Sequence, residues 1–212
     1  MTTTQTAALT PPPDEADWVL TYLGVRIAVG VVGATLPVVL FISHYFFGDG
    51  LMPDSISAFY YTPMRNYLVG SLCAQGVFLF CYRYARRDNW LSTLAGVLVI
   101  VVALSPTVAA GASTTVWNVA HGVAAGGFYV ILAYFAYFLF TRSDHPVAPG
   151  SRKALRNTIY RVCGVVVALS MLVAFVLLRS PVHLLFWWET IATFAFSFAW
   201  LVKGGLFFAD RP

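Results

Sequence analysis

Three ionisable side chains stand out because each lies within or beside a long apolar stretch. Glu189 and His121 lie inside two such stretches, and Arg65 opens a third. A guanidinium can hold a carboxylate through two parallel hydrogen bonds, and an imidazole can donate to that carboxylate or take its proton. We therefore expect Glu189, His121 and Arg65 to face inward and to form one connected polar cluster.

Neutral polar residues accompany the three ionisable ones. Asn118 precedes His121 by three residues, and Thr193 follows Glu189 by four, so each pair shares one face of a helix. Gln75 continues the Arg65 side of its stretch. The candidate ligand-binding residues are Arg65, Gln75, Asn118, His121, Glu189 and Thr193.

Four roles are open for this cluster. It can be purely structural and fix the register of helices. It can bind a lipid headgroup, a small solute or a partner helix, and an anionic headgroup would suit Arg65. It can catalyse lipid hydrolysis or transfer with Glu189 or His121 as general base, with or without a metal. It can begin an ion or proton pathway through Glu189, Thr193 and Ser197. As a function we favour binding over catalysis, and catalysis over transport.

Metal binding is a separate question, because three histidines and one acid are expected at a similar level. The candidate metal ligands are His44, His121, His183 and Glu189. Zinc sites commonly take pairs of ligands from one local motif, whereas here each ligand would come from a separate segment. We therefore predict no metal, haem or other cofactor.

The composition indicates what surrounds these residues. Of 212 residues, 59% are hydrophobic and only 10% are charged, whereas soluble domains carry about 25% charged residues. A water-soluble enzyme and a disordered chain are both excluded. The net charge of +4 is typical of basic loops at a membrane, so we expect no nucleic-acid partner.

Six apolar stretches predict an all-α, polytopic membrane protein, since about 20 apolar residues span a bilayer. The predicted helices cover about 24–47, 66–82, 89–104, 116–140, 159–178 and 184–202. They form one domain, 18–203, between a disordered tail at 1–17 and a short tail at 204–212. Eleven of the 13 Lys and Arg residues fall on one side of this arrangement, which predicts both termini in the cytoplasm and a plasma-membrane location.

The expected partners are membrane lipids and other helices. Gly122 and Gly126 are spaced GxxxG, a pattern that lets two membrane helices approach closely. This spacing favours a partner helix or a second copy of the chain at that face.

The segment between the first two helices is too polar and too rich in Pro and Gly to span a membrane, yet it contains several aromatic residues. These are Phe59, Tyr60, Tyr61 and Tyr67. Because amphipathic rings favour the headgroup level, we expect this loop to hug the membrane interface or to cover the bundle as a lid.

The same loop carries a family resemblance. Ile56–Ser57, Pro63, a charged residue opening the second helix and Gly70 inside it resemble the first-loop pattern of the Frag1/DRAM/Sfk1 family. The basic stretch YRYARR at 82–87 is similar too, as is the position of His121.

This resemblance implies a six-helix protein with cytoplasmic termini that acts in lipid handling, autophagy modulation or membrane scaffolding, mostly without an established catalytic activity. The chain departs from the family at Met64–Arg65, where the family's loop often has an acid just after the proline.

Overall fold

The computed structural model describes residues 15–48, 50–83, 89–109, 111–143, 145–177 and 184–209, with side chains from Tyr22 onward. This part of the chain contains six α-helices: α1 (Glu15–Phe47), α2 (Arg65–Cys81), α3 (Asn89–Leu104), α4 (Val116–Tyr134), α5 (Arg152–Leu177) and α6 (Leu185–Lys203). A short 3-10 helix, η1 (Ser57–Tyr61), precedes α2, and a π-helical turn, η2 (Phe135–Leu139), continues α4. The predicted all-α class is confirmed.

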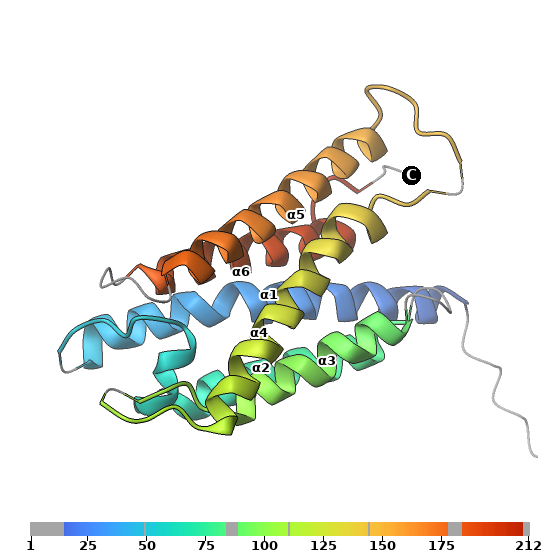
Figure 1. Cartoon of the computed structure of the whole chain (residues 1–212). Coiled ribbons are helices and arrows are strands. Elements are labelled where there is room, and N and C mark those ends of the chain that lie inside the picture. Colours follow the sequence, from blue (N-terminus) through green and yellow to red (C-terminus); the bar gives the residue numbers. More distant parts are fainter. Residues whose placement is uncertain are drawn as a thin grey trace, which may run out of the picture.

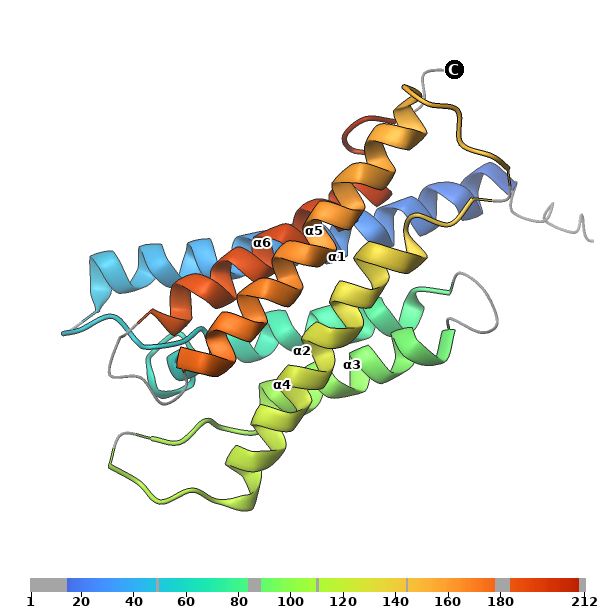
Figure 2. The ribbon, with the colours of Figure 1, turned by 45° about the horizontal axis from the view of Figure 1, so that its top comes forward.

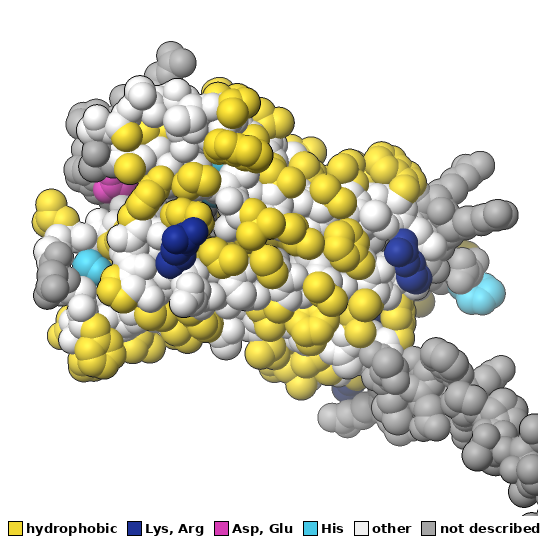
Figure 3. Space-filling model, turned by 90° about the horizontal axis from the view of Figure 1, so that it is seen from below, with side chains coloured by type: hydrophobic (Ala, Val, Ile, Leu, Met, Phe, Trp, Pro, Cys, Tyr) yellow, Lys and Arg dark blue, Asp and Glu magenta, His cyan; other side chains and the backbone are white. Residues whose placement is uncertain are grey.

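Four described helical segments are long and apolar enough to cross a membrane: Tyr22–Phe47, Val116–Leu139, Arg152–Leu177 and Leu185–Lys203. Helix α3 is apolar but has only 16 residues, and α2 has 17. Seen from below, many hydrophobic side chains lie on the surface between two groups of Lys and Arg side chains (Figure 3). The membrane class is supported, while the expectation of six spans stays a prediction.

Most helix ends agree with the positions predicted from the sequence, and the starts of two helices do not. Helices α2, α3 and α6 begin and end within one residue of the predicted positions. Helix α1 begins at Glu15 and α5 at Arg152, both earlier than the apolar stretches. The Ser151 hydroxyl accepts a hydrogen bond of 3.1 Å from the Ala154 N–H, an N-cap that starts α5 within a polar segment. Residues 1–14 lie outside the described ranges.

The helices form a closed ring in chain order. Each helix packs against the next, and α6 packs back against α1. In Figures 1 and 2, α4 crosses from the α2–α3 pair to the α5–α6 pair. Close approach of α2 and α3 requires glycine, because a Cβ on Gly96 would lie 2.9 Å from the Gly76 carbonyl oxygen.

The two ends of the bundle differ in charge. The start of α1, the end of α6 and the α4–α5 connection share one end, and the loop before α2 and the α3–α4 connection share the other (Figure 1). We call the first the basic end; its described cations include Arg26, Arg83, Arg142, Lys153, Arg156 and Lys203. We call the second the Glu189 end.

A buried aromatic layer separates the basic end from the Glu189 half of the bundle. Trp200 is fully buried, and its ring centroid lies 4.7 Å from Tyr82 and 5.1 Å from Phe140. Phe196, one turn before Trp200, is also buried. This layer fixes how α2, α4 and α6 face one another.

Candidate functional site

The loop between α1 and α2 folds onto the Glu189 end of the bundle. The Ser55 hydroxyl accepts a hydrogen bond of 3.0 Å from the Ala58 N–H, which starts η1. Ile56 and Phe59 are then buried against α1, α2 and the start of α6, where Phe186 is also buried. The loop therefore packs as part of the core and covers the interior of the bundle.

Three hydrogen bonds of 2.6 Å hold this loop in place. The Ile56 N–H donates to the Glu189 carboxylate, and the Phe186 N–H donates to the Asp54 carbonyl, so two of them tie the loop to α6. The Tyr61 hydroxyl donates to the Thr107 carbonyl in the α3–α4 connection. We call residues 54–61 the lid.

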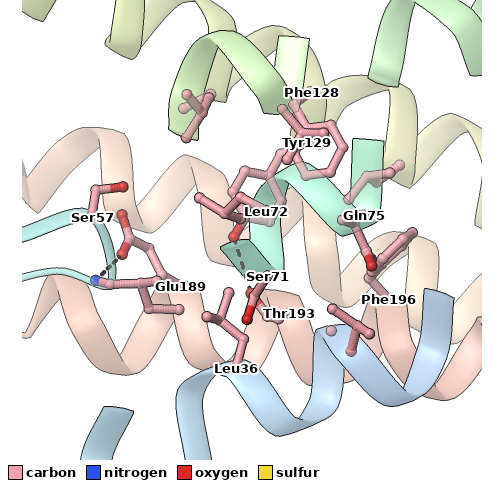
Figure 4. A pocket seen from close by; sticks show the side chains of 17 residues that line it. Leu36, Ser57, Ser71, Leu72, Gln75, Phe128, Tyr129, Glu189, Thr193 and Phe196 are labelled. Carbon is pink, nitrogen blue, oxygen red and sulfur yellow. Dashed lines mark hydrogen bonds between the residues drawn. The ribbon is translucent and has the colours of Figure 1, made fainter. Parts of the chain in front are cut away.

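A cavity of about 60 Å³ lies beneath the lid, between α1, α2, α3, α4 and α6 (Figure 4). Most of its wall is apolar. Its polar lining residues are Ser57, Ser71, Gln75, Tyr129, Glu189 and Thr193. A water molecule needs roughly 10–15 Å³ measured in this way, so the cavity has room for a few waters or one small polar group.

The polar atoms of the cavity are unevenly satisfied. The Tyr129 and Thr193 hydroxyls lie 3.0 Å apart and share a hydrogen bond. The Gln75 side-chain amide donates to the Val29 carbonyl at 3.1 Å, but its Oε1 atom is buried and has no partner among the described residues. A residue that lines the cavity therefore carries a buried acceptor without a hydrogen bond from the described residues.

Gly33 leaves space for the side chains of Gln75 and Ser197. A Cβ atom on Gly33 would overlap the Ser197 hydroxyl and would lie 3.4 Å from the Gln75 Nε2 atom. The Ser197 hydroxyl donates to the Thr193 carbonyl at 2.7 Å. Gly33 thus lets α1 approach α6 where Gln75 and Ser197 meet.

The structure brings three of the predicted site residues together and leaves two of the three ionisable residues, Arg65 and His121, outside the cavity. Glu189, Thr193 and Gln75 line the same cavity. Arg65 is exposed; its guanidinium lies 4.1 Å from the Tyr60 ring centroid and donates to the Tyr60 hydroxyl. The expected contact between Arg65 and Glu189 is not formed, because the first residue of α2 points toward η1 rather than into the bundle.

His121 also lies apart from Glu189. Its Nδ1 atom is 2.7 Å from the Ser105 carbonyl and 3.1 Å from the Val102 carbonyl. These carbonyls lie at the end of α3, where helical acceptors lack intrahelical donors. The imidazole therefore holds the α3–α4 turn, and the expected connected cluster of Arg65, His121 and Glu189 does not exist.

Asn118 serves the same turn. Its side chain forms a capping box with Thr115, and its Nδ2 atom donates to the Pro106 carbonyl at 2.9 Å. This predicted site residue fixes where α4 begins and does not line the cavity.

The remaining candidates are dispersed. In the described ranges, no three His, Cys, Asp or Glu side chains gather in a way that could hold a metal ion. The His44 ring packs edge-on against Phe59, and His183 lies outside the described residues. Gly122 and Gly126 face outward, and a Cβ on either would meet nothing within 4 Å. A contact of these glycines with a partner helix stays a prediction.

Sequence reasoning missed Tyr129, Ser57 and Ser71 as cavity residues. Tyr129 looks like an ordinary aromatic residue within an apolar run. A usable signal was its spacing of eleven residues from Asn118, about three helical turns, which places the two on one face of α4. The two serines carry no comparable signal.

No family model, no curated protein and no solved structure matches this chain. Membership of the Frag1/DRAM/Sfk1 family therefore stays a prediction, and the case for a function depends on the geometry of the cavity.

Proposed function

We propose that this chain is a membrane-embedded binding protein whose cavity accepts the hydrogen-bond-donating headgroup of a lipid or a similar amphiphile. One observation carries the proposal: Gln75 lines the cavity, and its buried Oε1 atom has no donor among the described residues. An unsatisfied buried acceptor costs about 1–3 kcal/mol, and a bound hydroxyl or amine would recover much of that cost.

The charge of the cavity narrows the ligand class. Among the described lining residues, Glu189 is the one ionisable acid, and no Lys or Arg lines the wall. A carboxylate and an amide oxygen both accept hydrogen bonds, so they favour a neutral or cationic donor. Arg65 suggested an anionic headgroup as the ligand. Because Arg65 is exposed and does not line the cavity, it no longer supports that choice. The apolar wall suits the first carbons of an acyl chain.

We further propose six membrane spans with the basic end in the cytoplasm of a plasma-membrane protein. The concentration of Lys and Arg at that end supports this orientation. The cavity then lies in the extracytoplasmic half, beneath the lid. This arrangement agrees with what the resemblance to the Frag1/DRAM/Sfk1 family implies.

The two alternatives have less support. A lipid hydrolase would need a general base near the ligand. His121 is engaged with the Val102 and Ser105 carbonyls, and the Glu189 carboxylate already accepts the Ile56 N–H. An ion or proton pathway from Glu189 would have to pass the buried rings of Phe196 and Trp200. Binding therefore remains the function that the cavity supports best.

The test is native mass spectrometry of the detergent-purified protein after incubation with 1-monooleoylglycerol or with oleate. We expect the parent to retain monooleoylglycerol in preference to oleate. Gln75→Leu should reduce the retained fraction about fivefold, the equivalent of one buried hydrogen bond. Val77→Leu, on the exposed side of α2, is the matched control and should behave like the parent. Equal retention by Gln75→Leu and the parent would contradict the proposal.

A further inference from the structure

A second hollow lies at the Glu189 end, on the outside of the bundle. Its volume is about 320 Å³, and α1, the loop before the lid and the start of α6 form its walls. It shares no lining residue with the cavity that contains Gln75. Its lining residues include Phe41, His44, Tyr45, Asp54, Phe186 and Trp187. We call this hollow the aromatic groove.

One side of the aromatic groove is a continuous wall of rings. The Trp187 ring centroid lies 5.6 Å from that of Phe41 and 5.3 Å from that of Phe186. Phe186 is buried in the core beneath the lid, so it fixes the position of the wall, while Trp187 and Phe41 are partly exposed. The negative faces of such rings attract cations, and cages of this kind bind quaternary ammonium groups.

An acidic residue, Asp54, also lines the groove. The Phe186 N–H donates to the Asp54 carbonyl at 2.6 Å, which holds Asp54 beside the aromatic wall. No Lys or Arg of the described chain lines the groove, and His44 lies on its α1 side. Aromatic faces together with a carboxylate complement a cation and disfavour an anion.

An apolar stripe leads from this groove along α1. Val38, Phe41, Ile42 and Tyr45 are all exposed, and their spacing of three, four and seven residues places them on one face of the helix. Such a stripe on an apolar helix suits an acyl chain. The occupant that fits both features carries a cationic head and a hydrocarbon tail.

We propose that the aromatic groove binds the trimethylammonium headgroup of phosphatidylcholine, with an acyl chain lying along the Val38–Tyr45 face of α1. The rings enclose the ammonium group beside Asp54, and the phosphate lies outside the groove, whose described lining contains no Lys or Arg. A quaternary ammonium fits better than a primary one, because it carries no N–H group that needs a hydrogen-bond acceptor.

The experiment is competition measured by native mass spectrometry. The full-length protein is offered equal concentrations of dioctanoyl phosphatidylcholine, phosphatidylethanolamine and phosphatidylglycerol. We expect the parent to retain phosphatidylcholine about fivefold more than phosphatidylglycerol, with phosphatidylethanolamine between them. Trp187→Leu, which removes a ring of the wall, and Asp54→Asn should each bring the three lipids close to equal retention.

Trp117→Leu is the matched control, because it removes an exposed tryptophan of α4 that does not line the groove. It should keep the preference, as should Gln75→Leu, which separates this proposal from the one on the inner cavity. Circular dichroism checks that Trp187→Leu and Asp54→Asn are folded. Equal retention of the three lipids by the parent would overturn the proposal, as would folded groove variants that keep the preference. Displacement of the lipid by an equal concentration of soluble phosphocholine would overturn the assignment to a lipid.

Discussion

The Glu189 carboxylate accepts a hydrogen bond of 2.6 Å from the Ile56 N–H, a residue 133 positions earlier in the chain. This bond joins α6 to the lid directly above the cavity. The acid that stands out in the sequence therefore has a backbone partner, and its role includes closing the bundle at that end.

Replacing Glu189 should loosen the lid. Glu189→Leu leaves the buried Ile56 N–H without an acceptor, which should lower the free energy of unfolding by about 1–3 kcal/mol and speed exchange of the Ile56 amide. Glu189→Gln keeps an acceptor and should change both quantities much less. Hydrogen exchange followed by mass spectrometry measures the amide directly. Slow exchange in Glu189→Leu, equal to that of the parent, would show that the lid is held without this bond.

A methyl group added at Gly33 should disturb the packing of α1 against α6 beside the cavity. Gly33→Ala drives its Cβ into the Ser197 hydroxyl, so we expect a loss of about 1–3 kcal/mol in unfolding free energy. Removing that hydroxyl with Ser197→Ala in the same chain should restore most of the loss. Gly24→Ala is the control, since a Cβ there meets nothing within 4 Å and a helical alanine is favoured over glycine. Additive effects of the Gly33 and Ser197 changes would contradict the predicted contact.

His121→Leu should reduce stability without changing ligand retention. The substitution leaves the Ser105 and Val102 carbonyls without the imidazole donor, at a cost of about 1–3 kcal/mol. At a temperature where the variant is folded, it should retain monooleoylglycerol as the parent does. A stable variant that no longer retains the ligand would place His121 in the binding site, against this account.

Thiol labelling tests the orientation in the membrane. In a background without the native cysteines, Ser113→Cys lies in the α3–α4 connection at the Glu189 end, and Ser143→Cys lies at the basic end. We expect a membrane-impermeant maleimide to label the cysteine at 113 in intact cells and the one at 143 only after permeabilisation. The reverse pattern would place the basic end outside the cytoplasm.

The sequence predicts the helices well because apolar length decides where a membrane segment can lie. Asn89–Leu104 agrees at both ends. The start of α5 was missed, because its first turns are polar and apolarity is no guide there. Ser151 was the available signal, as an N-cap followed by residues that favour helix.

The candidate site was predictable only in part. The spacing of Glu189, Thr193 and Ser197 correctly placed them on one inward stripe, where Thr193 and Ser197 are buried. The rotation of α2 and α4 was not predictable in the same way, since helices that are apolar all round give no preferred inward face. Arg65 and His121 were therefore assigned to the wrong neighbours. The partner of Glu189 is a backbone N–H, which leaves no signature in residue types.

The most direct test of the central claim is an experimental map of the detergent-purified parent protein, obtained by electron cryo-microscopy without added ligand. The account predicts density for a small polar group beneath the lid, with a polar atom within about 3 Å of the Gln75 Oε1 atom. A cavity that is empty, or that contains only water, in a well-resolved map would contradict it.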